Sequence, residues 1–270
     1  MDVGYFRRVF GNFNVTNNLA QTKFGQFEIT APADSRLPNS GGQTITGLYN
    51  VDPSQFGRTN NLVNLADNFG VSQIQHWNGV EVNVTARMRE GLTFQGGTST
   101  GRTSTDTCAV RAAFPATNPT NPYCHIDNPF LTQVKGLVSY IVPKIGVAVS
   151  SAFQSIPGGN LAANYTVPAA TITASLGRAP TGFSTVNLVA PGSVQGDRVN
   201  QIDLRAGKIL KFGRLRTQFS VDLYNMLNTS AVQTYNQTYI PTAATGSSAW
   251  LAPQAILPAR FAKLTAQIDF

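Results

Sequence analysis

The stretch VNQIDLRAGKILKFGRLRTQFSVDLYNMLN, residues 199–228, alternates apolar and polar side chains on both sides of Gly213. A helix would scatter these side chains around its circumference, whereas a strand separates them onto two faces. Lys208 is the one charge in the apolar row. The stretch therefore predicts two long strands joined by a tight turn. The apolar row comprises Ile202, Leu204, Ala206, Leu210, Phe212, Leu215, Phe219, Val221 and Leu223.

The same period of two recurs along the chain. In NGVEVNVTARM, residues 78–88, every second side chain from Val80 to Met88 is apolar, and RFAKLTAQIDF, residues 260–270, alternates in the same way. That last stretch also fits a helix by itself, but the recurrence favours strands. The whole pattern predicts eight strands, at about residues 3–17, 72–88, 92–106, 130–142, 146–157, 198–212, 215–227 and 259–270.

The connections between these strands alternate in length. Tight turns with Gly or Pro are expected at residues 89–91, 143–145 and 213–214. In an up-and-down sheet consecutive connections emerge at opposite ends. All short turns then lie on one side and all long loops on the other, as in outer-membrane barrels. Long, irregular loops rich in Asn, Gly, Pro, Ser and Thr are expected at about residues 18–71, 107–129, 158–197 and 228–258.

The expected fold is one all-β domain over residues 1–270, an antiparallel up-and-down transmembrane β-barrel. A strand in lipid has to pair its backbone on both sides, so the sheet must close, with the apolar row toward lipid. Eight strands is the smallest closed count, so a complete small barrel and the last part of a larger one both stay open. A soluble β-sandwich also alternates, although its strands are usually shorter.

The polar row carries charges of both signs, which we expect to face the lumen. Unpaired buried charge is costly, so these side chains must pair in a small barrel or meet water in a wide one. Aromatic side chains near strand ends are candidates for girdles at the membrane interfaces. The expected lumen-facing charges are Glu81, Arg87, Asp203, Arg205, Arg216, Asp222, Lys263 and Asp269, and the aromatic candidates are Tyr5, Trp77, Tyr140, Phe212, Trp250 and Phe261.

Composition excludes several classes of function. The net charge of +7 is dispersed over the chain and forms no patch or stripe, which argues against nucleic-acid binding. The sequence contains no run of 18 or more apolar residues, so no transmembrane helix is expected. The opening MDVGYFRRVFGNF lacks the basic flank and continuous apolar core of a signal peptide. For an exported protein, we therefore expect the chain to be part of a longer precursor.

The two cysteines, Cys108 and Cys124, lie in a stretch rich in Pro and Asn. We expect a disulfide that closes the 107–129 loop in an oxidising compartment. In the chain-entropy model, closing so short a loop contributes about 3 kcal/mol. A zinc site that includes His125 is less well supported, because there is no CxxC pair and no fourth ligand. Neither a metal nor a cofactor is expected.

GGTSTGRT, residues 96–103, contains two partial catalytic motifs. As a phosphate loop it has Arg102 in place of the lysine, and it lacks the preceding buried strand and the following helix. As a nucleophile elbow it would need a strand-to-helix turn and a histidine oriented by an acid, whereas Ser99 is expected inside a strand. The positions of His125 and Asp106 in the sequence give no reason to take them as catalytic partners of Ser99. We expect small residues of a barrel wall here, and a protein that is not an enzyme.

Two stretches, DLRAGKILKFGR (203–214) and DLYNMLN (222–228), carry a resemblance to a known family. They resemble fairly specific motifs in the C-terminal end of TonB-dependent receptor barrels, in particular those of the Oar-like receptors of acidobacteria and their relatives. Phe270, the last residue, resembles the C-terminal assembly signature of outer-membrane barrels. The resemblance covers essentially the whole chain. The other similar stretches are MDVGYFRR (1–8), FLTQVKGL (130–137), GDRVNQ (196–201) and LPARFAKLTAQIDF (257–270).

The resemblance implies a protein of the cell outer membrane that imports a bulky ligand. It implies four partners: membrane lipid, the barrel-assembly machinery, TonB and a plug domain. Such receptors have a signal peptide, an N-terminal plug, a TonB-contacting segment and about 22 strands, and Oar-like members add a carboxypeptidase-regulatory-like β-domain. None of those parts is recognisable here, so the resemblance places this chain in the last third of a barrel.

Two other functions remain open. One is a free-standing barrel whose loops bind sugars or other surfaces in adhesion, without transport. The other is a soluble secreted β-sandwich, for example a carbohydrate-binding module. The sequence does not identify the ligand, because the loops show no acidic calcium pattern, no aromatic cage and no basic cluster.

Overall fold

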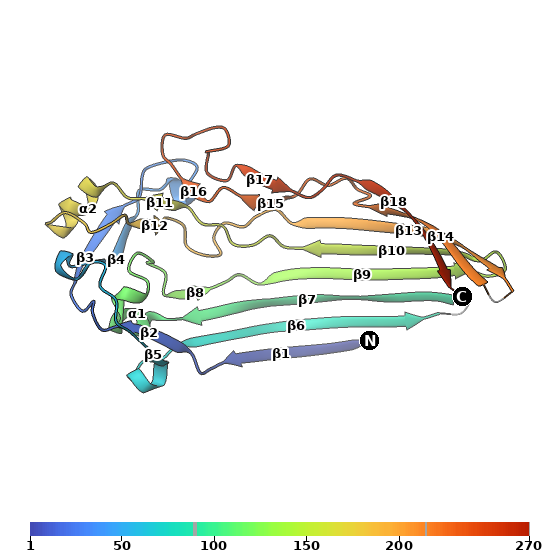
Figure 1. Ribbon diagram of the computed structural model, residues 1–270, viewed down its shortest axis with the longest axis horizontal. Helices are drawn as coiled ribbons and strands as arrows, with labels where there is room; N and C mark the ends of the chain where they lie inside the picture. The colour runs from blue at the N-terminus through green and yellow to red at the C-terminus, as the bar shows by residue number, and fades with distance from the viewer. Residues whose placement is uncertain (89–90, 214, 270) are drawn as a thin grey trace.

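The computed structural model describes residues 1–88, 91–213 and 215–269, with the backbone alone at residues 211, 212, 215 and 269. Its main element is an antiparallel sheet whose long strands lie side by side in chain order, with the short β8 added beside β7 (Figure 1). The strands of this sheet are β1 (Asp2–Phe10), β6 (Ile74–Arg87), β7 (Leu92–Asp106), β8 (His125–Asp127), β9 (Leu131–Val142), β10 (Val147–Ile156), β13 (Val199–Phe212), β14 (Leu215–Tyr224) and β18 (Phe261–Asp269).

The predicted strands agree with the observed ones from residue 72 onward. Their ends differ by three residues or fewer; the largest difference is β14, which ends at Tyr224 where 227 was predicted. The prediction of one strand over residues 3–17 is wrong. β1 ends at Phe10, and Asn12 turns the chain with a φ of 57°, a conformation that asparagine adopts more readily than most residues. β2 (Asn14–Asn18) then pairs with β5 (Asn61–Leu65) in a separate small sheet.

Within the described residues the main sheet is open. Among the described strands, β1 pairs only with β6, and β18 pairs only with β14. The other side of each of these two edge strands therefore pairs with no described strand. The all-β, antiparallel architecture with strands in chain order is therefore present. The predicted closure into a barrel is not seen in residues 1–88, 91–213 and 215–269.

The long connections are folded, contrary to the expectation of irregular loops. Most of them gather at one end of the sheet, opposite the end with the hairpin turns (Figure 1). They contain further small sheets, two short helices and several 3₁₀ turns. These elements are β3 (Phe24–Thr30) with β4 (Thr44–Val51), β11 (Asn164–Thr166) with β12 (Thr185–Asn187) and β16 (Thr238–Tyr239), β15 (Val232–Tyr235) with β17 (Pro253–Ile256), α1 (Cys108–Ala113), α2 (Ala169–Leu176), and 3₁₀ turns at Pro38–Ser40, Pro53–Gln55, Ala66–Phe69 and Pro115–Thr117.

The hydrophobic core lies in these connections and not in the main sheet. The larger buried cluster, here called the loop core, draws on three of the four long connections. The smaller one joins Val15, Ala66 and Val110. None of the buried apolar side chains that the structure describes belongs to the eight long strands. The loop core consists of Phe27, Ile29, Ala31, Leu37, Ile45, Leu48, Ala163, Val167, Ile172, Val186, Leu188, Val189, Tyr239 and Trp250.

The main sheet has the opposite distribution of polarity. Its buried side chains are polar, namely those of Ser104, Thr217, Ser220 and Asp222. Many of its large apolar side chains are exposed, with Leu264 at 80%. In a water-soluble protein this arrangement would leave a wide apolar surface without cover. The exposed set includes Val3, Tyr5, Val80, Phe94, Val138, Val149, Phe153, Phe219, Val221, Leu264 and Ile268.

Candidate functional site

The strand register sorts the side chains of the main sheet onto two faces, since residues directly opposite each other across paired strands share a face. On the first, here called the apolar face, one row crosses seven strands through Ala86, Phe94, Val138, Ser151, Leu204, Leu223 and Ala262. On the second, the polar face, the adjacent row runs through Arg87, Thr93, Ser139, Ser150, Arg205, Asp222 and Lys263. These two rows therefore differ in chemistry, although the polar face also carries the exposed apolar side chains of Phe6, Leu137 and Ile141.

The apolar face has a band without charged residues. Along β7 this band covers residues 92–100, between the turn and Arg102, which lies on the same face. Nine residues at ~3.3 Å each span about 30 Å along the strand. At the strand tilt of roughly 40° that is usual in barrels, this becomes about 23 Å across a membrane, close to the ~25 Å apolar band of outer-membrane barrels.

Lys208 is the one exception near the turn end of the apolar face. Its ammonium group donates a hydrogen bond to the carbonyl of Ile145 in the turn between β9 and β10. A long aliphatic stem that carries its charge to the polar boundary is a common solution for a lysine at an interface. Lys208 thus lies at the rim of the band and does not interrupt its centre.

The eight predicted lumen-facing charges all fall on the polar face by register, with Asp269 placed by its backbone alone. Arg205 and Asp222 form a bidentate ion pair, in which the Nη2–Oδ2 distance is 3.0 Å. Glu81 accepts a hydrogen bond from Ser99 at 3.2 Å. Asp203 accepts hydrogen bonds from the side chain of Gln201 and the backbone of Asn225. That this face lines a lumen stays a prediction.

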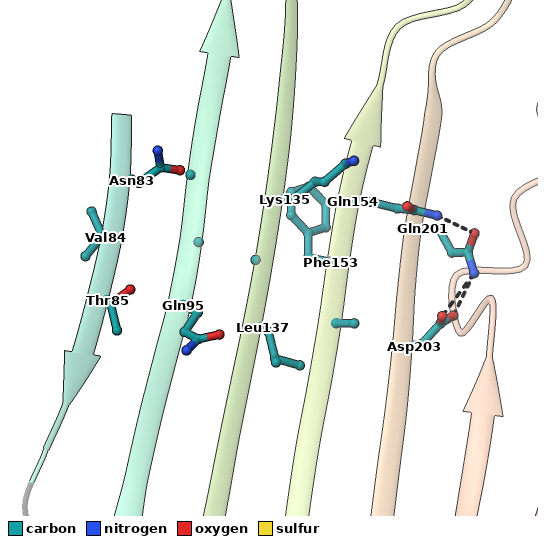
Figure 2. A pocket seen from close by; sticks show the side chains of 14 residues that line it. Asn83, Val84, Thr85, Gln95, Lys135, Leu137, Phe153, Gln154, Gln201 and Asp203 are labelled. Carbon is teal, nitrogen blue, oxygen red and sulfur yellow. Dashed lines mark hydrogen bonds between the residues drawn. The ribbon is translucent and has the colours of Figure 1, made fainter. Parts of the chain in front are cut away.

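A hollow of about 660 Å³ lies on the sheet beside these charges (Figure 2). Gly96, Gly97 and Gly136 lie along its floor, where the lack of side chains leaves room for the hollow. Gln154 donates to Gln201, which in turn donates to Asp203. These bonds hold the amides in place on one wall. The polar groups that line it are those of Asn83, Thr85, Gln95, Lys135, Gln154, Gln201 and Asp203.

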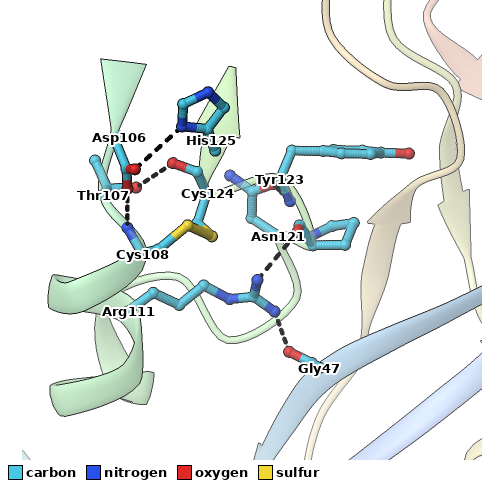
Figure 3. Close-up of a disulfide and its surroundings, with 10 residues drawn as sticks. Gly47, Asp106, Thr107, Cys108, Arg111, Asn121, Tyr123, Cys124 and His125 are labelled. Carbon is cyan, nitrogen blue, oxygen red and sulfur yellow. Dashed lines mark hydrogen bonds and ion pairs between the residues drawn. A yellow bond between two sulfur atoms is a disulfide. The ribbon is translucent and has the colours of Figure 1, made fainter. Parts of the chain in front are cut away.

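At the loop end, a disulfide joins Cys108 and Cys124, whose Cα atoms are 4.8 Å apart (Figure 3). The Thr107 amide donates to the carbonyl of Cys124 at 2.8 Å, so the backbone is paired at the same place. Arg111 then connects this loop to β4, because its guanidinium donates to the carbonyls of Gly47 and Pro122. The 107–129 connection is therefore fixed both to itself and to the 18–71 connection.

His125 lies beside the disulfide, between two carboxylates. Its Nδ1 is 3.1 Å from Asp106 Oδ2, and its Nε2 is 3.3 Å from Asp127 Oδ2. The bond to Asp106, and then the bond to Asp127, raise the pKa of His125 above its usual value. The contact between His125 and Asp106 joins β8 to the end of β7, and it is an ion pair when the ring is protonated.

A second cluster fixes the 18–71 connection to the 228–258 connection. Tyr239 donates to Asp34 at 2.6 Å, and Arg36 pairs with the same carboxylate. Arg36 also donates to the carbonyls of Ala243 and Pro241. Hydrogen bonds from Arg36 and Tyr239 hold the pKa of Asp34 well below its usual range, and burial raises the pKa of Tyr239 to about 12.

A second hollow, here called the loop hollow, lies where three of the long connections meet. Its volume is about 500 Å³, within the range of roughly 300–1,000 Å³ that is common for small-molecule sites. Four aromatic side chains line it, although no local pattern in the sequence brings them together. The lining residues are Gln21, Phe24, Tyr49, Asn50, Val51, Phe56, Ala116, Pro119, Thr120, Thr181, Gly182, Phe183 and Ser184.

The structure does not assemble the catalytic motif considered for Ser99. Ser99 lies inside β7 on the polar face, bonded to Glu81, whereas Asp106 lies on the apolar face at the end of the same strand. His125 does contact Asp106, but it lies at that same end. The glycines of GGTSTGRT pack closely, since a Cβ at Gly101 would collide with the Trp77 ring. No group of three or more His, Cys, Asp or Glu side chains among the described residues is arranged to hold a metal ion.

Three of the predicted girdle aromatics lie away from the apolar face. Trp250 is buried in the loop core and donates to the carbonyl of Ala162 at 2.8 Å, because its neighbours are loop residues from distant parts of the chain. Trp77 lies on the polar face over Gly79 and Gly101. Phe261 lies on the polar face as well, where its ring stacks on that of Tyr224 with the centroids 4.7 Å apart. Tyr5 and Tyr140 lie on the apolar face, as expected for a girdle. The side chain of Phe212 and the predicted assembly signal Phe270 lie outside the described residues.

No protein-family model matches the chain, and no curated protein matches it either. No helix among the described residues is long and apolar enough to cross a membrane. Any proposal about function therefore rests on the two faces of the main sheet and the folded connections at its loop end.

Proposed function

We propose that the chain forms part of the barrel wall of an outer-membrane receptor of the TonB-dependent type, and that this receptor imports a bulky ligand. One observation carries the proposal: the long strands expose their apolar side chains and bury polar ones. Exposed apolar side chains are costly in water and stable in lipid, because burial of apolar area contributes about 25 cal/mol per Å². Such a face, eight strands wide, needs a lipid environment.

The soluble β-sandwich is a poorer explanation. A sandwich buries the inner faces of two packed sheets in a common core. Within the described residues, every buried apolar side chain belongs to the long connections, and none comes from the long strands. No second sheet in the described part of the chain shares a core of buried apolar side chains with the main sheet, as a sandwich requires.

Closure of the wall follows from the same reasoning. The outer sides of β1 and β18 carry backbone groups that pair with no other described strand. In lipid each unsatisfied backbone group costs several kcal/mol, so an open edge is not stable there. We infer that these two edges pair with additional strands of a larger barrel. A pairing of β1 with β18 in a small barrel is the alternative.

The remaining roles follow from the resemblance in the sequence. The polar face, with its Arg205–Asp222 pair and amide-lined hollow, would face the lumen and a plug domain. The folded connections would form the outer mouth that captures the ligand. The C-terminal strand would meet the barrel-assembly machinery, and TonB would supply the energy for uptake. In this proposal the chain has no catalytic role and does not bind nucleic acid.

Fractionation of cells that produce the polypeptide tests the proposal. We expect the polypeptide that contains this chain in the outer-membrane fraction, resistant to a carbonate wash. We also expect it to migrate faster on a gel before heating than after it, because a closed barrel resists unfolding by detergent. Recovery in the soluble fraction, with migration that heating does not change, would contradict the proposal.

A binding or adhesion role without transport is the second candidate. It is favoured by the folded state of the connections, whose own core gives them a fixed shape. The two roles differ in their dependence on energy. Uptake through a TonB-dependent receptor stops when a protonophore collapses the proton gradient, whereas adhesion continues.

A further inference from the structure

We propose that the loop hollow is a binding site for a neutral oligosaccharide. Its walls come from three connections that are far apart in the chain: residues 21–56, 116–120 and 181–184. The inference rests on the proposed function in one respect, because the hollow must face the outside of the cell to meet such a ligand. It assigns the ligand class, which the sequence leaves open.

Charge is the first argument for this ligand class. No charged side chain is among the described residues that line the loop hollow. Two arginines lie next to it, and both guanidinium groups donate to groups of the protein. Arg178 donates to the side chain and carbonyl of Asn50 and to the carbonyl of Val51. Arg111, whose guanidinium is 6.0 Å from the centre of the Tyr49 ring, donates to the carbonyls of Gly47 and Pro122. A ligand charge in the hollow would lose its hydration without finding an opposite charge, and that loss costs free energy. The site therefore favours an uncharged ligand.

Aromatic exposure is the second argument. Phe183 is 97% exposed and Phe56 is 56% exposed, while Phe24 and Tyr49 line the interior of the hollow. Phe56 is positioned by Gly182, where even a Cβ would approach its ring to 3.3 Å. Exposed rings at the mouth of a hollow provide flat apolar platforms. The C–H face of a pyranose ring packs against such a platform.

Hydrogen bonding is the third argument, and it distinguishes a sugar from a purely apolar ligand. The hydroxyl groups of Tyr49 and Thr120 make no hydrogen bond to any residue that the structure describes. An apolar ligand would remove these groups from water and leave them unpaired, which costs free energy for each buried group. Sugar hydroxyls can both donate to and accept from them. A neutral saccharide meets the three requirements together.

The walls of the loop hollow are fixed before a ligand arrives. Asn50 donates to the carbonyl of Thr181 and accepts from its amide and hydroxyl, which joins two of the three walls. The amide of Tyr49 donates to the carbonyl of Pro119 at 2.8 Å, which joins the third. That third wall belongs to the loop closed by Cys108 and Cys124. The disulfide therefore holds one wall of the site in place.

Calorimetric titration of the polypeptide that contains this chain, purified in detergent micelles, tests the inference. The probes are maltotriose, cellotriose and xylotriose, with trigalacturonate as a charged comparator of equal length. We expect at least one neutral trisaccharide to bind with a dissociation constant of about 1 mM or tighter. Phe183→Ala is expected to weaken binding about two- to twelvefold, which corresponds to the loss of one aromatic contact of about 0.5–1.5 kcal/mol. A double Cys108→Ser, Cys124→Ser variant is expected to bind more weakly as well.

Phe130→Ala is the matched control, because Phe130 is also an exposed phenylalanine but packs under Arg102, away from the loop hollow. Its affinity should equal that of the unchanged protein. All variants are first checked for the heat-dependent gel shift. If the shift is present and no neutral trisaccharide binds, the inference is wrong and the proposed function stands. If trigalacturonate binds as well as the neutral probes, or Phe183→Ala binds like Phe130→Ala, the inference is also wrong. Absence of the shift in the unchanged protein would instead contradict the proposed function.

Discussion

Arg205 of β13 and Asp222 of β14 lie directly opposite each other in the strand register and form a bidentate ion pair on the polar face. The Asp222 side chain is only 4% exposed, whereas that of Arg205 is 49% exposed. The carboxylate thus depends on the guanidinium for much of its hydrogen bonding. Lys263 lies opposite Asp222 on the other side, in β18. The pair therefore joins β13 to β14 on the polar face.

Asp222→Asn is expected to destabilise the sheet by about 1–3 kcal/mol. Breaking a buried pair costs more than this, but exposure of Arg205 to solvent reduces the loss. Urea unfolding in detergent micelles measures the change. Glu81→Gln is the control, because Glu81 lies on the same face and accepts only one hydrogen bond, from Ser99. Equal stability of the two variants would show that the Arg205–Asp222 pair has no special role.

Leu48→Ala is expected to destabilise the loop core by about 2–5 kcal/mol, since Leu48 is completely buried there. The main sheet should keep its stability, because it contributes no side chain to that core. Fluorescence of Trp250 in a Trp77→Phe background reports on the loop core alone. The heat-dependent gel shift reports on the sheet. Loss of both signals at the same denaturant concentration would mean that the loop core and the sheet unfold as one unit.

The contact between His125 and its two aspartates is expected to depend on pH. Asp106 and Asp127 raise the pKa of His125, so its stabilising contribution is fully present below about pH 6.5, the value for an unperturbed histidine. It is lost as the pH rises through the higher value of the folded protein. The charged groups nearby are Arg102, whose guanidinium also acts on Asp127, and the two aspartates themselves.

Trypsin cleavage at Arg111 measures this effect, compared at each pH with a His125→Asn variant so that the enzyme's own pH dependence cancels. We expect the unchanged protein to be better protected than the variant below pH 6.5 and equally protected at high pH. NMR titration of the His125 ring, in a His76→Gln background, gives the pKa directly. A ratio of cleavage rates that does not change with pH would exclude the proposed role of His125.

Val138→Arg is expected to destabilise the protein in lipid by about 2–4 kcal/mol, the cost of a charge near the centre of the bilayer on the outer face of a barrel. Val138 lies in the middle of the apolar face. Ser139→Arg, one residue along on the polar face, is the matched control and should change stability by much less. Reversible unfolding in liposomes measures both variants. Similar losses for the two would argue against a lipid-facing side.

The sequence predicted the long strands well because their signal is local. Alternation over ten or more residues, such as that from Val199 to Phe212, identifies a strand and its two faces without any knowledge of distant contacts. The same rule failed at residues 3–17, where alternation continues beyond Phe10 although the chain turns at Asn12.

The loop core could not be predicted, because its members have no periodic relationship. Phe27, Ile172 and Trp250 belong to one cluster although more than 70 residues separate each from the next. The loop hollow was missed for the same reason. Its aromatic residues Tyr49 and Phe183 are isolated in the sequence, and only folding of the connections brings them to one site. Short strands among Gly- and Asn-rich turns gave no signal that the connections fold.

The most direct test of the membrane assignment is a scan of spin labels along β9. Single cysteines are introduced one at a time at residues 134–142, while Cys108 and Cys124 remain in their disulfide. Collision rates with oxygen, which dissolves in lipid, and with a water-soluble nickel complex are measured in liposomes. We predict that the rates alternate with a period of two: high oxygen exposure at Val134, Val138 and Val142, and high nickel exposure at Lys135 and Ser139. Nickel exposure as high at Val138 as at Ser139, or protection of Val138 from both reagents, would contradict the account.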